Sequence, residues 1–95
     1  MSTYLIFTRE KTLDERELAI YSKAVPATLA GHAPKVLAFY GPHEDLEGPP
    51  SEGTVVMEFA HAAAAKAWYN GAPYREAREH RFKGATFRVT LVEGV

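Results

Sequence analysis

The sequence contains no cysteine among its 95 residues, which excludes a disulfide scaffold, a thiolate metal site and a cysteine nucleophile. It also has no excess of one charge: 11 Lys and Arg stand against 12 Asp and Glu, and the net charge is −1. This balance argues against a nucleic-acid-binding surface and against electrostatic attachment to a membrane. The amino terminus has no basic stretch before a long apolar segment, so we expect no signal peptide, no membrane-spanning helix and a cytoplasmic location.

Hydrophobic residues make up 46% of the chain, which excludes an intrinsically disordered protein. The length is that of one domain, residues 1–95, and it suffices for a single core of modest stability. Glycine and proline cluster in residues 41–53. We predict that this segment is the one long loop.

Apolar runs rich in β-forming residues alternate along the chain with segments of helical periodicity. In the first helical segment, Asp14 and Glu17 have the spacing of a capping box, and Gly31 marks the end. Pro26 lies inside this segment and predicts either a kink or two helices that meet there. The sequence thus predicts strands at 3–9, 35–40, 54–59 and 85–92, and helices between residues 14 and 31, at 61–70 and at 73–81.

These elements follow in the order βαβ and then βαβ, in two halves of nearly equal length. Each half is long enough for a right-handed crossover connection. We therefore predict an α+β fold with the ferredoxin-like βαββαβ topology. Its four-stranded antiparallel sheet would carry the helices on one face.

Apolar residues occupy both faces of the first three predicted strands. Residues 4–7, 36–40 and 55–59 are mostly apolar, whereas residues 85–92 alternate between apolar and polar. Because the helices cover one face only, the other face would leave about 340 Å² of surface in projection. A monomer rarely exposes so large an apolar patch. We expect a two-fold homodimer through the sheet faces, forming a barrel-like sandwich; the alternative is a ligand groove in a monomer.

Several short segments carry a resemblance to a known family. They include VVMEF at 55–59, AKAWY at 65–69 and LVEGV at 91–95, together with residues 4–6, Tyr21, 25–28, 31–32, 46–48, 73–75 and Arg81. In order and spacing they resemble the family catalogued as domain of unknown function 1330, within the dimeric α+β barrel superfamily. The sequence departs from it at 32–34, where His-Ala-Pro stands in place of the usual Gly-Gly pair. The resemblance implies the fold and a homodimer, and no activity, since a shared fold is only an analogy for function.

Glu58 and His32 are the candidate catalytic residues. Glu58 lies in an apolar strand, where burial would raise its pKa toward the range of a general acid or base. Its structural alternative is a carboxylate paired with Arg88 or another arginine across the sheet. His32 continues the apolar stripe of the first helix and could carry protons beside the sheet. The alternative is a histidine that interacts with the carbonyl groups at the helix end.

Four further residues are candidates for substrate binding. Tyr21, Trp68 and Tyr74 could line a pocket between the sheet and the helices; the alternative is core packing with hydrogen-bonded polar tips. Arg81 could hold an anionic group. Its alternative is a solvated helix face on which Arg75, Arg78 and Arg81 alternate with Glu76 and Glu79.

Two classes of function remain open. The first is a cofactor-free enzyme that carries out proton transfer, isomerisation or oxygenation on a small apolar or anionic metabolite. The second is a non-catalytic dimeric module that binds a small molecule or acts as a scaffold. We expect no cofactor. We also expect no metal, because the four histidines show no metal-ligand spacing. RNA binding is disfavoured because Thr54 and Val56 stand where an RNA-recognition motif needs stacking aromatic residues.

Overall fold

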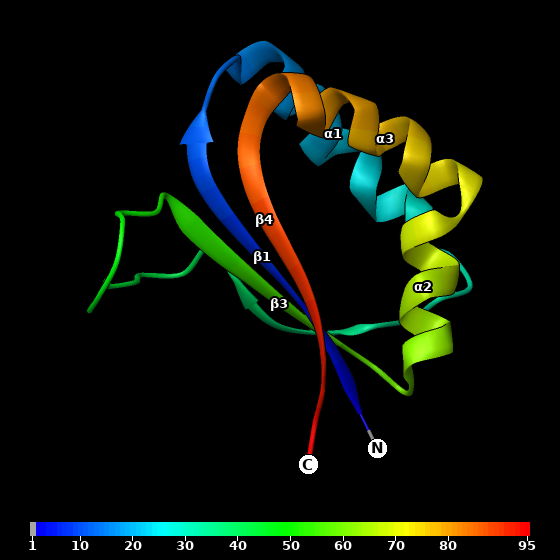
Figure 1. The fold of residues 1–95 in the computed structure, drawn as a ribbon. Coiled ribbons are helices and arrows are strands. Elements are labelled where there is room, and N and C mark those ends of the chain that lie inside the picture. Colours follow the sequence, from blue (N-terminus) through cyan, green and yellow to red (C-terminus); the bar gives the residue numbers. More distant parts are fainter. Residues whose placement is uncertain (1) are drawn as a thin grey trace.

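The computed structural model describes residues 2–95 as one antiparallel sheet with its helices on one side (Figure 1). The sheet order is β2-β3-β1-β4. This arrangement confirms the predicted ferredoxin-like α+β fold. The elements in chain order are β1 (Thr3–Thr12), α1 (Glu15–Thr28), β2 (Lys35–Phe39), β3 (Gly53–Phe59), α2 (Ala62–Asn70), α3 (Ala72–Gly84) and β4 (Ala85–Glu93).

Helix α1 starts as predicted and ends earlier. The Asp14 carboxylate accepts hydrogen bonds from the backbone N–H groups at the start of the helix, which makes it the N-cap. The helix continues through Pro26, so the predicted alternative of two helices is wrong. Pro26 lies in the last turn, so the intrahelical hydrogen bond that it cannot donate is one of the final ones of the helix. The helix ends at Thr28 rather than at Gly31, whose φ of +81° belongs to the turn that follows.

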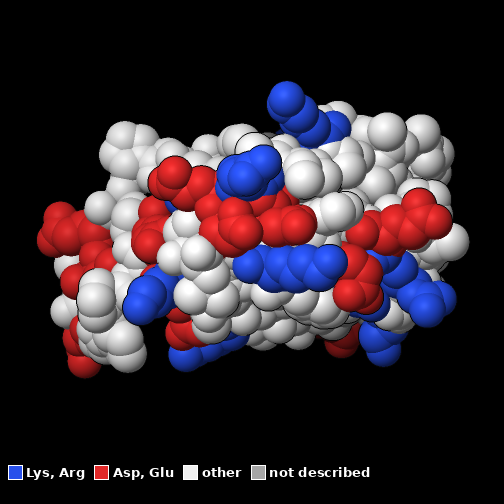
Figure 2. Space-filling view, turned by 90° about the horizontal axis from the view of Figure 1, so that it is seen from above, with Lys and Arg blue, Asp and Glu red and all other residues white. Residues whose placement is uncertain are grey.

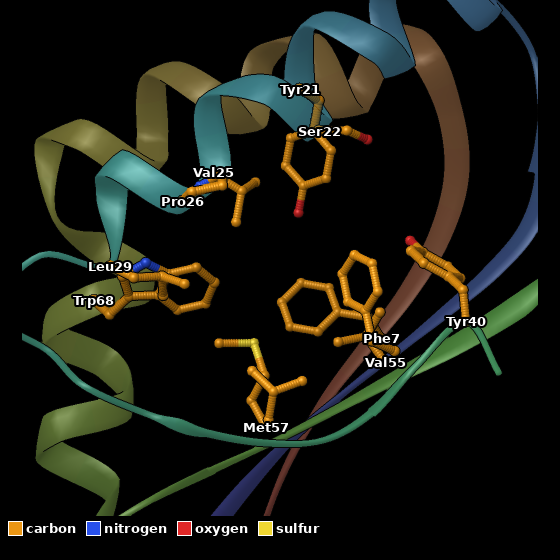
Figure 3. A pocket seen from close by; sticks show the side chains of 12 residues that line it. Phe7, Tyr21, Ser22, Val25, Pro26, Leu29, Tyr40, Val55, Met57 and Trp68 are labelled. Carbon is orange, nitrogen blue, oxygen red and sulfur yellow. The ribbon is translucent and has the colours of Figure 1, made fainter.

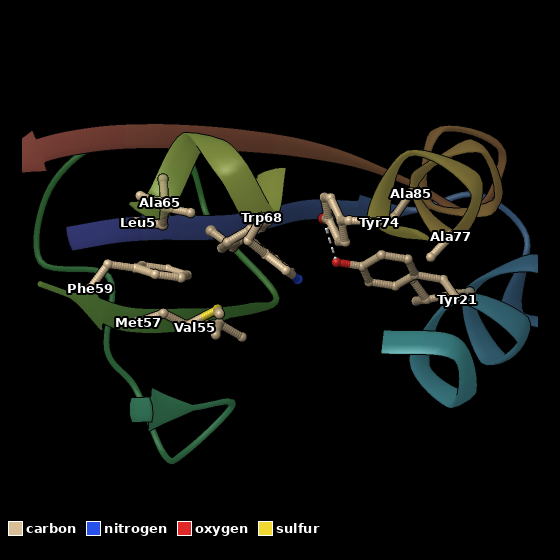
Figure 4. Close-up of a cluster of buried hydrophobic side chains, with 12 residues drawn as sticks. Leu5, Tyr21, Val55, Met57, Phe59, Ala65, Trp68, Tyr74, Ala77 and Ala85 are labelled. Carbon is tan, nitrogen blue, oxygen red and sulfur yellow. Dashed lines mark hydrogen bonds between the residues drawn. The ribbon is translucent and has the colours of Figure 1, made fainter. Parts of the chain in front are cut away.

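The core lies between the sheet and the helices. Along β3 and the first half of β1, every second residue is buried against the helices. Trp68 of α2 stands at its centre, with its ring centroid 4.1 Å from that of Tyr74 and 5.9 Å from that of Phe59 (Figure 4). Such aromatic pairs stabilise a core beyond the area that they bury. The position of Trp68 therefore sets how α2 and α3 approach the sheet.

The other face of the sheet has no helix over it (Figure 1). Tyr4 and Ile6 of β1 and Val56 of β3 lie here, between the residues that point toward the helices, and are only partly buried. The Cα framework is flat, measuring 32 × 31 × 17 Å. The accessible surface is 6199 Å², against about 5,400 Å² expected for a monomer of this mass. We call this uncovered side the open face.

Strand β2 and the loop after it form the least packed edge. Every residue of β2 is exposed, and Phe39 retains 68% of its accessible surface. Tyr40 follows with a φ of +50° and turns the chain away from the sheet. The far end of the loop is held by Glu52, which accepts hydrogen bonds from the Thr12 hydroxyl and backbone N–H. These bonds hold the pKa of the Glu52 carboxyl below its ordinary value.

Charged side chains are mixed on the surface seen from above in Figure 2. Lys and Arg lie among Asp and Glu there, without a large patch of one sign. Among the helices of residues 2–95, none combines the length and the apolar composition needed to span a bilayer. Within the same residues, no three His, Asp or Glu side chains come together as a metal site.

Candidate functional site

A cavity of about 180 Å³ lies between α1 and the helix side of the sheet (Figure 3). Helix α1 packs chiefly against α3 rather than against the strands. The space lies between the second half of α1, the edge strand β2 and the centre of the sheet. Its lining consists of Phe7, Tyr21, Ser22, Val25, Pro26, Leu29, Val36, Phe39, Tyr40, Val55, Met57 and Trp68.

The walls of this cavity follow from two sequence periodicities. Tyr21, Val25 and Leu29 are spaced by one turn on α1 and form the predicted apolar stripe. Phe7, Val55 and Met57 come from alternate positions of β1 and β3. The lining is thus mainly apolar. An engineered apolar cavity of about 150 Å³ binds benzene, so this space is large enough for one ring with a small substituent.

Tyr21 brings a polar group to the inner end of the cavity. Its hydroxyl points inward in Figure 3 and lies 2.8 Å from the Tyr74 hydroxyl, and either can be the donor. Burial raises the pKa of Tyr21 far above its ordinary value of 10.0, and the neighbouring Tyr74 raises it further. Burial also raises the pKa of Tyr74. Both hydroxyls therefore keep their protons near neutral pH. Because one proton serves the bond between them, the other is free to donate to a further acceptor.

Arg81 lies beside this tyrosine pair and is almost completely buried, with 3% of its surface exposed. The predicted alternative of a solvated arginine face is therefore wrong for Arg81. It shares one face of α3 with Tyr74 and Ala77, which are also buried. Its Nη2 lies 3.5 Å from the Tyr69 hydroxyl, and its Nε is buried without a hydrogen-bond partner among residues 2–95. Its positive charge lowers the pKa of Tyr21 and of Tyr74, against the larger effect of burial.

Trp68 forms one wall with a fixed ring orientation. Its indole Nε1–H donates to the Thr28 hydroxyl oxygen over 3.0 Å. That hydroxyl in turn donates to the backbone oxygen of Val25 over 2.6 Å. The chain of bonds ties α2 to the last turn of α1, so the ring cannot turn without loss of a buried hydrogen bond. Trp68 is thus both a core residue and a lining residue.

Glu58 lies on the open face, on the other side of the sheet from the cavity. Its carboxylate accepts a hydrogen bond of 3.4 Å from the Tyr4 hydroxyl. Lys35 stands opposite it on β2. The predicted pairing with Arg88 is wrong, because Arg88 donates to Glu10 instead.

His32 lies in the turn after α1, where its backbone N–H donates to the carbonyl of Leu29. It is half-buried, and it does not belong to the cavity lining. The structure thus brings together four candidates, Tyr21, Trp68, Tyr74 and Arg81, and leaves Glu58 and His32 apart from them. The roles assigned to all six from the sequence stay predictions.

The sequence reasoning missed the outer part of the site. Val36 and Phe39 of β2, with Tyr40 after it, line the mouth of the cavity. A signal existed in the apolar run at 36–40, which is too rich in large side chains for a solvated edge strand. The bulge between Val36 and Ala38 changes which residues of β2 face the helices, so the sequence alone gave no simple alternation there.

Comparison with protein-family models assigns the chain to a family. The family model for "Domain of unknown function (DUF1330)" matches residues 2–95, and the chain belongs to that family. None of the curated proteins matches the chain.

Three solved structures have the same fold. A protein of unknown function from Rhodopseudomonas palustris is 18% identical, with a TM-score of 0.74, and the match covers 99% of this chain and 82% of that one. A dimeric protein of unknown function with a ferredoxin-like fold, from Bacteroides fragilis NCTC 9343, is 14% identical, with a TM-score of 0.64 and coverage of 98% and 96%. An ethyl tert-butyl ether D (EthD) family protein from Bacillus halodurans C-125 is 14% identical, with a TM-score of 0.65 and full coverage of both chains, 100% and 100%. At these identities the likeness extends to the fold alone.

Proposed function

We propose that this member of the DUF1330 family is a homodimeric protein that binds a small, largely apolar molecule in the cavity under α1. The observation that carries the binding role is the apolar cavity of about 180 Å³ beside the core. Apolar concave sites with a few polar groups are the usual form of small-molecule sites. The polar groups of this lining include the hydroxyls of Tyr21, Ser22 and Tyr40. Such hydroxyls favour binding over proton abstraction, because they hold their protons at neutral pH.

The open face is the feature that supports the proposed homodimer. Its centre is apolar, with Ile6 opposite Val56 on the neighbouring strand. Strands of 5 to 10 residues make a face of roughly 500 Å² in projection. Because side chains project from the sheet, its accessible area is larger and approaches the ~800 Å² per partner of a stable interface. The dimeric protein from Bacteroides fragilis, which has the same fold, adds support.

Substitution inside the cavity tests the binding role. We expect toluene at about 100 times its Kd to stabilise the protein by about 2.7 kcal/mol. Val25→Phe fills the space under α1, where Val25 points into the cavity (Figure 3), and should abolish this stabilisation. Ile20→Phe, on the exposed side of α1, is the matched control and should retain it. Thermal unfolding with and without toluene measures both. Equal stabilisation of the two variants would contradict binding in this cavity.

Sedimentation tests the dimer. We expect the wild-type chain to sediment at twice 10.5 kDa at micromolar concentration. Val56→Asp places a charge at the centre of the open face and should shift the protein to monomer, because an unpaired charge is costly to bury. Ala63→Asp adds the same charge on the exposed surface of α2 and should leave the dimer intact. A wild-type monomer would refute the pairing.

A further inference from the structure

We propose that the molecule in this cavity carries a negatively charged oxygen, such as a carboxylate, which accepts a hydrogen bond from the Tyr21 hydroxyl. This inference rests on the proposed binding function and names the chemical class of the ligand. It follows from three features: a buried cation, Arg81, that lies behind the lining residue Phe7; a pair of protonated hydroxyls; and one donor proton in that pair that the pair itself does not use.

The buried cation is the first step of the argument. Arg81 has 3% of its surface exposed, yet the ion pairs among residues 2–95 involve other side chains. Aromatic rings surround it instead: its guanidinium carbon lies 5.1 Å from the Phe82 ring centroid, 5.2 Å from that of Phe87 and 5.8 Å from that of Phe7. Buried charges are usually paired with an opposite charge. Among residues 2–95, this positive charge is therefore compensated by aromatic faces and by the Tyr69 hydroxyl, and not by a carboxylate, while its Nε has no hydrogen-bond partner.

The second step is the path from this charge to the cavity. Phe7 lies under Arg81 and also lines the cavity. The charge of Arg81 acts on the hydroxyls of Tyr21 and Tyr40, both of which are lining residues, and on that of Tyr74. An anion in the cavity would therefore experience the field of Arg81 in a region of low dielectric, where charges interact more strongly than in water.

The third step is the hydrogen bond itself. When Tyr74 donates to Tyr21, the Tyr21 proton is free; Figure 4 draws the hydrogen bond between the two hydroxyls. The Tyr21 hydroxyl then donates to an oxygen in the cavity while it accepts from Tyr74. Chains of this kind polarise each member and strengthen the terminal donor. Donation to a charged acceptor is about twice as strong as donation to a neutral one.

The remaining lining fits the rest of such a ligand. Val25, Leu29, Val55 and Met57 offer apolar contact around a space that holds about one ring. A ligand that combines one ring or a short branched chain with a carboxylate matches both parts. Benzoate, benzamide and toluene share a ring and differ in charge and in acceptor strength, so they separate the contributions.

The test is calorimetric titration of the intact protein with these three probes at one pH and ionic strength. We expect benzoate to bind at least ~10-fold more tightly than benzamide. Tyr21→Phe should weaken benzoate binding by ~10-fold to 100-fold and change toluene binding little. Tyr4→Phe removes a hydroxyl from the open face and is the matched control, with benzoate affinity unchanged. Arg81→Gln should also lose the preference for benzoate; if it fails to fold, Tyr21→Phe decides alone.

The outcomes separate the two proposals. Equal affinity for benzoate, benzamide and toluene, or an unchanged benzoate affinity in Tyr21→Phe, would overturn the anionic class and leave the apolar binding site standing. Absence of binding by all three probes would overturn the binding function, and the anionic class with it.

Discussion

Gly84 allows α1 and α3 to approach closely, and its replacement by alanine should destabilise the protein. A Cβ at this position would lie 2.7 Å from the backbone N of Leu18, 2.9 Å from its Cα and 3.1 Å from its Cβ. Ordinary contacts start at 3.4 Å, so the shortest one falls 0.7 Å short (3.4 − 2.7). The two nearest of these atoms, the N and Cα of Leu18, belong to the backbone of α1 and cannot move aside alone, so the whole helix must shift.

The expected sign is opposite to that of helix propensity. In a helix, alanine is favoured over glycine by about 1 kcal/mol, whereas overpacking of this kind costs about 1–3 kcal/mol. The Gly84 carbonyl also accepts hydrogen bonds from the backbone N–H groups of Leu13 and Asp14, at 2.8 and 3.0 Å, and a shift of α1 would weaken both. We therefore expect a net loss of about 1–2 kcal/mol, or a fall in Tm of roughly 5–15 °C for a domain of this size.

Thermal unfolding followed by circular dichroism measures the effect, with Gly41→Ala as the control. A Cβ on Gly41 would meet no atom within 4 Å, so this loop variant should unfold within a few degrees of the wild type. The shift of α1 should also separate Tyr21 from Tyr74 and weaken benzoate binding. A Gly84→Ala protein as stable as the wild type, or more stable, would refute the close approach of the two helices.

Two further predictions concern buried side chains. Tyr21 has an ordinary pKa of 10.0, which burial raises in the folded protein. Above pH 10 the unfolded chain therefore loses this proton, while the folded protein keeps it. The free energy of unfolding should then fall by about 1.4 kcal/mol for each pH unit and each such tyrosine. Urea denaturation between pH 9 and 11 should show a shallower fall in Tyr21→Phe, and equal slopes would contradict the burial. Thr28→Val removes the acceptor of the Trp68 indole N–H and should lower the free energy of unfolding by about 1–3 kcal/mol, which the urea midpoint measures; an unchanged midpoint would show that the bond contributes little.

The sequence predicted the elements because their signals are local. The Asp14 N-cap, the α1 stripe and the alternation in residues 85–92 each depend on neighbours along the chain, and all appear in the structure. The position of Glu58 could not be predicted. Both faces of its strand are apolar, so its pattern does not say which face turns toward the helices.

Arg81 shows a different limit. Its charge and its glutamate neighbours indicated a solvated face, yet it follows Tyr74 and Ala77 on the buried stripe of α3. The spacing of seven residues from Tyr74 was the available signal, and the tertiary surroundings outweighed the charge. The outer wall of the cavity was unpredictable for a related reason, since it depends on the bulge in β2 and on the packing of α1 against α3.

The exposed edge strand has a consequence for how such a protein can diversify. Val36 and Phe39 border the entrance to the cavity but contribute little to the buried core, and the loop that follows them is exposed throughout residues 41–50. Under the proposed binding function, mutations there would alter which molecules enter at small cost to folding, whereas mutations at the inner end of the site would affect both. Variation in ligand choice among related chains should therefore concentrate at this rim, and directed evolution of new specificities should begin there.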